Sequence, residues 1–195
     1  QRGYRITLVD SASEAGGRVA KERNLPGLGE WGRVADYRLY QISQMANVEL
    51  FLESHMTTEI IAEFKAKRIV PVKGSRWCGK SIGRQNPLGI ERQPGAKILT
   101  PDDLMDGVAL AGDVVLFDDD HFYLGGTMAD KRNRAGCNVT LVTPAGEVSS
   151  WCQNTLEQHA IQKQLIEQGV KIYTAHNLQH IRTCEASLTC VYTDR

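Results

Sequence analysis

The stretch "VVLFDDDHFYLGG" at residues 114–126 decides how the fold of this chain is interpreted. It begins as a short buried strand and ends in a glycine pair that can enter a helix, which is the order of a nucleotide-binding β-α unit. In such a unit the turn between strand and helix is normally rich in glycine, because backbone N–H groups must close on phosphate. Here the turn carries Asp118, Asp119, Asp120 and His121. The stretch therefore predicts a nucleotide-type fold with an altered phosphate turn.

The same layout occurs twice in the chain. Residues 2–19, "RGYRITLVDSASEAGGRV", resemble residues 135–151, "AGCNVTLVTPAGEVSSW". Each copy continues through a helical stretch to a further apolar strand, "NVELFLES" in the first and "GVKIYTAH" in the second. Strands that alternate with helices predict parallel sheets covered by helices. We therefore expect an α/β fold made of two Rossmann-like halves.

Apolar periodicity and β-branched runs place the individual elements. The expected strands are Ile6–Val9, Val48–Leu52, Val114–Phe117, Val139–Val142 and Val170–Tyr173. The expected helices cover about 32–46 and 154–168, a third ends near Arg134, and Thr100 caps a fourth that starts at Pro101. The first copy has no counterpart of the strand, turn and helix that open the second. We therefore expect the chain to be a piece of a longer protein, and the alternative is a small complete domain that begins with a strand.

Composition restricts the class of protein. Lys+Arg and Asp+Glu both number 23 in 195 residues, so the balanced charge gives no support for a nucleic-acid or membrane-surface partner. No apolar run approaches the roughly 20 residues that a membrane span needs. The five cysteines form no C-x-x-C pair, which favours reduced thiols in a cytoplasmic protein and disfavours a zinc or iron–sulfur site made by these cysteines alone.

The first half carries the candidate cofactor-binding residues. Asp10 ends the first strand, where an acidic residue of a dinucleotide fold accepts hydrogen bonds from the ribose hydroxyls. The alternative role for Asp10 is to cap the turn "DSAS". Gly16 and Gly17 permit close backbone approach, and Arg18 can pair with phosphate. These four residues are the predicted nucleotide site.

The second half lacks the corresponding features. Alignment on the pattern G-x-G-x-x-G puts Asp118, Asp120 and Tyr123 at the glycine positions, and Thr143 stands where the ribose-binding acid belongs. Side chains then fill the space of a pyrophosphate, and the carboxylates repel its charge. Tyr123 also replaces the glycine that lets helix and strand pack closely. We expect a dinucleotide fold that no longer binds a dinucleotide there.

The acidic turn has two further interpretations. Three carboxylates with His121 could form a metal site, but consecutive turn residues point in different directions and no second ligand cluster is evident. We favour a structural role, in which carboxylates cap the free N–H groups at a helix N-terminus. No nucleophile arrangement such as G-x-S-x-G occurs, so we assign no catalytic and no metal-binding residue.

Several stretches resemble a known family: "GGRV", "LPGLGEWGRVADYR", "GSRW", "LTPDDLMDG", "VVLFDDDHFYLGG" and "VTLVTPAGEVSSWCQNTLEQHAIQKQLIEQGVKI". They are similar to the C-terminal part of the trimethylamine dehydrogenase-like NADH:flavin oxidoreductases, which include dimethylamine and histamine dehydrogenases and N-demethylating relatives. The resemblance implies two Rossmann-like halves of the FAD/NAD(P)-binding, disulfide-oxidoreductase type. Residues 1–75 would be the remainder of the ADP- or FAD-binding domain, incomplete at its N-terminus. Residues 76–112 would be a connecting segment, and residues 113–195 the NAD-domain-like half with a degenerate phosphate loop.

The resemblance also implies a function. This chain would be the ADP/FAD-binding and scaffold portion of a cytoplasmic flavin-dependent oxidoreductase that oxidises amines, and would be inactive alone. Electrons would pass from FMN through a [4Fe–4S] cluster, both held in a barrel domain outside this sequence. Asp10 would contact the adenosine ribose, and Gly16, Gly17 and Arg18 would lie near the phosphates. An electron-transfer flavoprotein is a candidate partner, and the full-length protein would be a homo-oligomer.

Two alternatives and two departures accompany this interpretation. The chain could be part of an NADH-dependent enoate or 2,4-dienoyl-CoA reductase, or a non-catalytic nucleotide-fold docking module. Pro71 and Lys73 stand in "VPVKGS", where the family has an "ATG" strand end, and could perturb the nucleotide pocket. The stretch "MADKRNRAG" at 128–136 is more polar than in the family, so we expect its helix to bury less surface.

Overall fold

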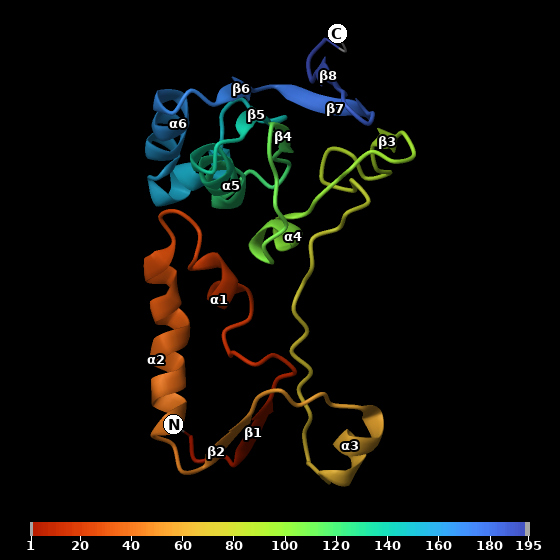
Figure 1. Ribbon diagram of the computed structural model, residues 1–195. Helices are drawn as coiled ribbons and strands as arrows, with labels where there is room; N and C mark the ends of the chain where they lie inside the picture. The colour runs from red at the N-terminus through yellow and green to blue at the C-terminus, as the bar shows by residue number, and fades with distance from the viewer. Residues whose placement is uncertain (1, 194–195) are drawn as a thin grey trace. The chain divides into compact units, whose positions relative to one another are not determined.

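The computed structural model describes residues 2–193 and divides into two compact units at the boundary between residues 75 and 76. Each unit contains a parallel sheet with helices in the connections between its strands (Figure 1). The predicted α/β fold with parallel sheets is therefore confirmed. The assignment of the units to nucleotide domains, and of residues 76–112 to a connection between them, stays a prediction. No helix among residues 2–193 is long and apolar enough to cross a membrane.

The first unit is built on two parallel strands. Its elements are β1 (Ile6–Val9), α1 (Arg18–Glu22), η1 (Gly29–Trp31), α2 (Gly32–Ser43), β2 (Val48–Phe51) and α3 (Thr58–Glu63). β1 and β2 pair in register from Ile6 with Val48 to Val9 with Phe51. Both strands agree with the sequence prediction to within one residue.

Small side chains and one ion pair hold α1 and α2 together. A Cβ on Gly16 would lie 3.1 Å from the Cβ of Ala35, so the loop before α1 approaches α2 closely. Arg23 lies against Gly32, where an added Cβ would overlap its guanidinium, and donates to both carboxylate oxygens of Asp36 at 2.8 and 2.9 Å. α1 and α2 are therefore fixed to each other mainly by close approach and one bidentate pair.

The second unit has a three-stranded parallel sheet and a smaller sheet. The elements of the first are β4 (Asp113–Phe117), α5 (Tyr123–Arg134), β5 (Asn138–Val142), η2 (Ser150–Thr155), α6 (Gln158–Glu167) and β6 (Lys171–Tyr173), with strand order β4-β5-β6. The second sheet pairs β3 (Glu91–Arg92) with β7 (His176–Ile181), and β7 with β8 (Ala186–Cys190). A short helix, α4 (Pro101–Met105), begins at Thr100 with a complete capping box, as its sequence predicts. α5 and α6 lie next to each other beside the parallel sheet (Figure 1).

The core of the second unit lies between its parallel sheet and α5 and α6. Ala129, Leu141, Val148 and Leu165 are at most 1% exposed. The β4–β5–β6 register, with Leu116 beside Leu141 and Leu141 beside Ile172, brings one row of apolar side chains across the sheet. This row and the helices form one continuous apolar layer, which positions the carboxyl ends of the strands.

The expectation that the polar helix at 128–136 buries less surface is wrong. Asp130 and Arg132 on α5 are 5% and 8% exposed. The Asp130 carboxylate accepts hydrogen bonds from Gln164 Nε2 at 2.9 Å, Gln168 Nε2 at 2.7 Å and Arg134 Nε at 2.6 Å. Polar groups can be buried when they are hydrogen-bonded. The helix is therefore buried, with Asp130 joining it to α6.

Residues 83–86, here called the strap, are tied to the second unit rather than standing free of it. Asn86 and Asn177 on β7 exchange two side-chain hydrogen bonds, at 2.8 and 3.1 Å. The guanidinium carbon of Arg84 lies 5.4 Å from the ring centroid of Trp151 in η2. Further along the same segment, Gln93 N–H donates to Ile181 O at 2.8 Å. The strap is thus held by contacts with β7 and η2, and the segment after it by a further bond to β7.

The predicted helix over 154–168 is shorter than expected. A 3-10 helix, η2, occupies residues 150–155, and α6 begins only at Gln158. Between them Leu156 has a left-handed backbone with φ 63° and is 90% exposed. Because a residue in this conformation cannot continue a right-handed helix, the chain restarts after it.

Replacing Leu156 with asparagine raises the free energy of unfolding of the second unit by about 1 kcal/mol, because asparagine tolerates the left-handed region better than leucine. Leu156 buries almost nothing that the change would lose. Urea denaturation followed by tryptophan fluorescence measures the effect. The matched control is Leu156→Ala, which keeps a Cβ and offers no local hydrogen bond, and it leaves the free energy nearly unchanged. Equal stabilisation by both variants would rule out the backbone explanation.

Candidate functional site

Asp10 lies at the carboxyl end of β1, as predicted. Its backbone N–H donates to Phe51 O at 2.9 Å and its carbonyl accepts from Ser54 N–H at 3.0 Å, so it is fixed beside the end of β2. Its carboxylate Oδ1 accepts from Ala12 N–H at 3.0 Å. The turn-capping role foreseen for Asp10 is therefore present. That bond occupies one of the two carboxylate oxygens, so capping and ribose binding are compatible.

The glycine pair and Arg18 lie at the start of α1. Gly16 has φ 118° and Gly17 has φ 56° with ψ −127°, a backbone that side chains with a Cβ disfavour. A Cβ on Gly17 would meet nothing within 4 Å, so its backbone faces open space. Arg18 Nη2 donates to Ser75 O at 2.9 Å, and Arg18 Nε lies 4.0 Å from Glu22 Oε1. Glu22 is only 2% exposed, so Arg18 has a structural task as the neighbour of a buried carboxylate.

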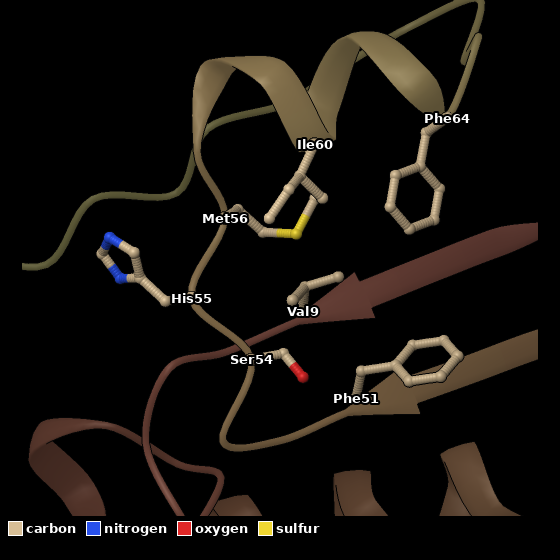
Figure 2. A pocket seen from close by; sticks show the side chains of 7 residues that line it. All are labelled: Val9, Phe51, Ser54, His55, Met56, Ile60 and Phe64. Carbon is tan, nitrogen blue, oxygen red and sulfur yellow. The ribbon is translucent and has the colours of Figure 1, made fainter.

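A pocket of about 340 Å³ lies next to the end of β1 (Figure 2). Ile60 and Phe64 point from α3 toward Val9 and Phe51 on the two strands. The remaining lining comes from the loop after β2, namely Ser54, His55 and Met56. The pocket is mainly apolar, and Ser54 is the residue whose N–H binds Asp10 O. The pocket therefore suits a flat apolar group, and the nearby Asp10 carboxylate suits hydroxyl groups attached to it.

Sequence reasoning found only part of this region. Asp10 lies next to the pocket through Val9 and Ser54, while Arg18 is directed to Ser75 and Glu22. The pocket-lining residues of α3 were missed because "ESHMTTEIIAEF" gives no motif. The sequence signal that could have found them is the position of "ESHM" directly after a parallel strand, where ligands of α/β folds bind.

In the second unit Asp118 is the residue of the acidic turn that points inward. It is 4% exposed, and its Oδ1 accepts from the backbone N–H groups of Asp120 at 3.2 Å and His121 at 3.1 Å. Its Oδ2 is buried and has no hydrogen-bond partner within residues 2–193. Burial raises the pKa of the Asp118 carboxyl to about 6, against the opposing effect of its bonds to the His121 N–H.

Asp119 and Asp120 have different surroundings from Asp118. Asp119 Oδ2 accepts from Gln85 N–H in the strap at 2.9 Å, and its Oδ1 lies 3.8 Å from His121 Nε2, too far for a hydrogen bond. Burial raises the pKa of Asp120, and the nearby Arg84 guanidinium opposes that rise. His121 itself is buried with φ 67°, and its Nδ1 lies 3.3 Å from Thr143 Oγ1.

The structural role that we favoured for the aspartates is present, because Asp118 binds backbone N–H groups. These N–H groups are not the predicted ones at the N-terminus of the helix. Asp118 binds N–H groups of the turn before the helix, whereas α5 begins after Phe122 with no side-chain cap. The close packing of strand and helix is also retained. A Cβ on Gly125 would lie 2.5 Å from Asp118 Cγ, and one on Gly126 would lie 2.5 Å from Ile161 Cγ2. The glycine pair therefore provides the close approach that Tyr123 cannot.

This arrangement does not fit a pyrophosphate. The Asp118 side chain lies against Gly125 at the start of α5, where a phosphate-binding helix would present open backbone. Asp119 and the strap close over the same turn. Three carboxylates in the turn would repel a bound phosphate, and the Arg84 guanidinium near Asp120 would oppose that repulsion only in part. The loss of dinucleotide binding in the second unit stays a prediction, which these contacts favour.

Comparisons with known proteins show what this chain is similar to. Residues 99–195 match the family model of the OYE-like second alpha/beta domain. Dimethylamine dehydrogenase of Hyphomicrobium sp. (strain x) is 32% identical over 183 residues, which make up 88% of this chain and 24% of that protein. The chain therefore spans about a quarter of the length of this curated relative.

Two solved structures superpose on the whole chain. Histamine dehydrogenase from Rhizobium sp. 4-9 matches 100% of this chain and 30% of its own at a TM-score of 0.96 and 43% identity. The 6-hydroxypseudooxynicotine amine oxidase of Pseudomonas geniculata N1 matches 100% of this chain and 29% of its own, at a TM-score of 0.94 and 36% identity.

Proposed function

We propose that this chain binds an adenine nucleotide in its first unit and serves as a scaffold through its second. The chain matches the C-terminal part of the dimethylamine and histamine dehydrogenase-like flavoproteins, and its residues 99–195 match the OYE-like second α/β domain. The nucleotide is ADP or FAD. The observation that carries this proposal is the apolar pocket beside Asp10 at the carboxyl ends of β1 and β2.

The residues of the first unit have separate tasks in this proposal. The pocket of Val9, Met56 and Ile60 takes the flat adenine base, which needs an apolar surface. Asp10 accepts hydrogen bonds from the ribose hydroxyls, because its carboxylate has acceptor capacity beyond the bond to Ala12. Gly17 presents backbone to open space, so a phosphate can approach it. Arg18 holds the start of α1 through Ser75 and supplies positive charge nearby.

We propose that the complete protein oxidises amines. The three relatives named above are two amine dehydrogenases and an amine oxidase, which supports a substrate with a C–N bond. In this proposal FMN would accept the hydride and a [4Fe–4S] cluster would carry the electrons onward. Residues outside this sequence would bind both groups. A homo-oligomer, a cytoplasmic location and an electron-transfer flavoprotein as the electron acceptor complete the proposal. The NADH-dependent reductase is the weaker alternative, because the second unit does not fit a pyrophosphate.

Replacing Asp10 with alanine weakens ADP binding about tenfold, since hydrogen bonds to a charged acceptor are worth about 1.5–3 kcal/mol. Isothermal titration calorimetry of the chain with ADP and with 2′-deoxy-ADP measures this. The wild type prefers ADP, and the preference disappears in the alanine variant because the acceptor of the 2′-hydroxyl is gone. Asp10→Asn keeps an oxygen for Ala12 and tests whether the turn alone is responsible.

Glu14→Ala is the matched control, because Glu14 is an exposed carboxylate in the same loop. It leaves the affinity for ADP unchanged. If the chain binds no ADP, or if the Asp10 and Glu14 variants behave alike, the nucleotide site is disproved and the non-catalytic docking module becomes the better description.

A further inference from the structure

We propose that the β4–α5 turn is a pH-responsive latch, which holds the strap against the second unit while the Asp118 carboxyl is protonated and releases it when that carboxyl ionises. The proposal concerns residues 83–86 and 118–121 and does not depend on nucleotide binding by the first unit. It rests on three features of the turn: its contact with the strap, its dependence on Asp118, and the charge that surrounds that carboxyl.

The contact between turn and strap is made by Asp119. The Gln85 N–H donates to Asp119 Oδ2 at 2.9 Å. Gly83 lies so close that a Cβ there would be 2.3 Å from the same oxygen. Asp119 is therefore enclosed by the strap on two sides, and any displacement of its side chain breaks the Gln85 bond.

The position of Asp119 depends in turn on Asp118. Asp118 Oδ1 binds the N–H groups of Asp120 and His121, which closes the turn around Asp119. His121 adopts φ 67°, a conformation that histidine seldom takes without outside support. That support comes from Asp118 Oδ1, and from Trp151, whose N–H donates to His121 O at 3.0 Å. Loss of the Asp118 contacts would relax the turn that presents Asp119 to Gln85.

Ionisation of Asp118 places a charge in a buried position, where the two turn N–H groups and His121 offset the loss of hydration only in part. Its Oδ2 is buried without a hydrogen-bond partner within residues 2–193. The titratable groups that face it are Asp120 and His121 from the turn and Cys152 from η2, while Asp119 and, from the strap, Arg84 act on Asp120. Two of these groups are carboxylates, so a second or third negative charge in the turn is repulsive.

The sign of the effect follows from the burial of Asp118. Burial raises the pKa of this carboxyl to about 6, while an opened turn exposes it to water and returns it to about 4. The closed turn thus binds the proton more tightly. The stabilisation of the closed latch is complete below about pH 4 and is lost as the pH rises through about 6. The full span corresponds to a change on the order of 100-fold in the equilibrium between closed and open latch.

Amide hydrogen exchange of the chain tests the latch. The protection factor of the Gln85 amide, corrected for the intrinsic pH dependence of exchange, is measured by NMR between pH 4 and pH 8. We expect it to fall by up to about 100-fold between about pH 4 and pH 6 and to stay level at higher pH. The Gln93 amide, bonded to Ile181 O further along the same segment, is the internal control and keeps its protection.

Two variants assign the effect. Asp118→Asn keeps an oxygen for the two turn N–H groups and cannot ionise, so the Gln85 protection becomes independent of pH. Asp120→Asn removes a neighbouring carboxylate of the same turn and retains the pH step. The latch is disproved by a flat profile in the wild type, by a step that persists in Asp118→Asn, by its loss in Asp120→Asn, or by a parallel fall of Gln93. If Asp118→Asn does not fold, the wild-type comparison of Gln85 with Gln93 still decides whether the strap opens by itself.

Discussion

Replacing Asp130 with alanine lowers the free energy of unfolding of the second unit by about 3 kcal/mol. The change removes a buried carboxylate and leaves the side chains of Gln164, Gln168 and Arg134 without their acceptor. Breaking a buried, hydrogen-bonded charge by deleting one partner typically costs about 3–5 kcal/mol. Urea denaturation followed by the fluorescence of Trp77 and Trp151, both in this unit, measures the loss.

The matched control for this prediction is Arg134→Ala. Arg134 is the exposed partner of the carboxylate, with a side chain 60% exposed, and its removal leaves the two glutamine bonds in place. A surface ion pair is worth about 0–1 kcal/mol, so this variant loses far less stability. Similar losses in the two variants would show that the ion pair, and not the connection from α5 to α6, provides the stabilisation.

Replacing Gly125 with alanine destabilises the second unit by about 2–3 kcal/mol, because its new Cβ would lie 2.5 Å from Asp118 Cγ and 2.6 Å from Asp118 Oδ2. The new Cβ would also lie 2.8 Å from Asp118 Cβ, an atom that cannot move away without a shift of the backbone. Thermal and urea denaturation of the variant measure the loss. The control is Gly146→Ala, where a Cβ would meet nothing within 4 Å and the expected change is small.

A double-mutant cycle identifies the cause of that loss. Asp118→Gly removes the side chain that the new Cβ meets, so Gly125→Ala is better tolerated in its presence. We expect a coupling free energy of about 1–2 kcal/mol between the two positions. Additive effects would mean that Gly125 is required for another reason, such as the local backbone.

Much of the fold could be predicted from the sequence because its signals are local. β1 and β2 are short runs rich in β-branched and apolar residues, and the first runs from Ile6 to Val9 as expected. The α4 helix begins at Thr100 because the cap, the proline and the acidic first turn all lie within four residues. The repeat of strand, helix and strand in the two halves likewise needs no knowledge of distant contacts.

The features that could not be predicted depend on partners far along the chain. Asp130 looks like a solvated residue of a polar helix, and hydrogen bonds from Gln164 and Gln168, far along the chain, help to make its burial possible. The three aspartates of the turn are chemically identical in the sequence, yet the turn geometry buries Asp118 and directs Asp119 to the strap. The strap itself has no periodicity, and its position is set by Asn177 and Trp151.

The proposed nucleotide site also has one part that the sequence predicts and one part that depends on packing. Asp10, Gly16, Gly17 and Arg18 come from a short motif and stay a prediction about binding. The pocket beside Asp10 comes from α3, whose apolar residues show their purpose only once they lie over the strands. A motif can therefore predict a place for a ribose and phosphates, whereas the apolar pocket that we propose for the base arises from packing.

The reciprocal bonds between Asn86 and Asn177 also constrain the order in which the molecule folds. The two residues are 91 positions apart, so joining them closes a long loop and carries a corresponding entropic penalty. β7 must exist before it can offer Asn177, whereas β4, α5 and β5 assemble from neighbouring segments. We therefore expect the Asn86–Asn177 bonds to form late in folding, after the parallel sheet. During synthesis they cannot form until the chain has been made beyond Asn177, and during refolding they wait for β7, so the strap is held incompletely until then.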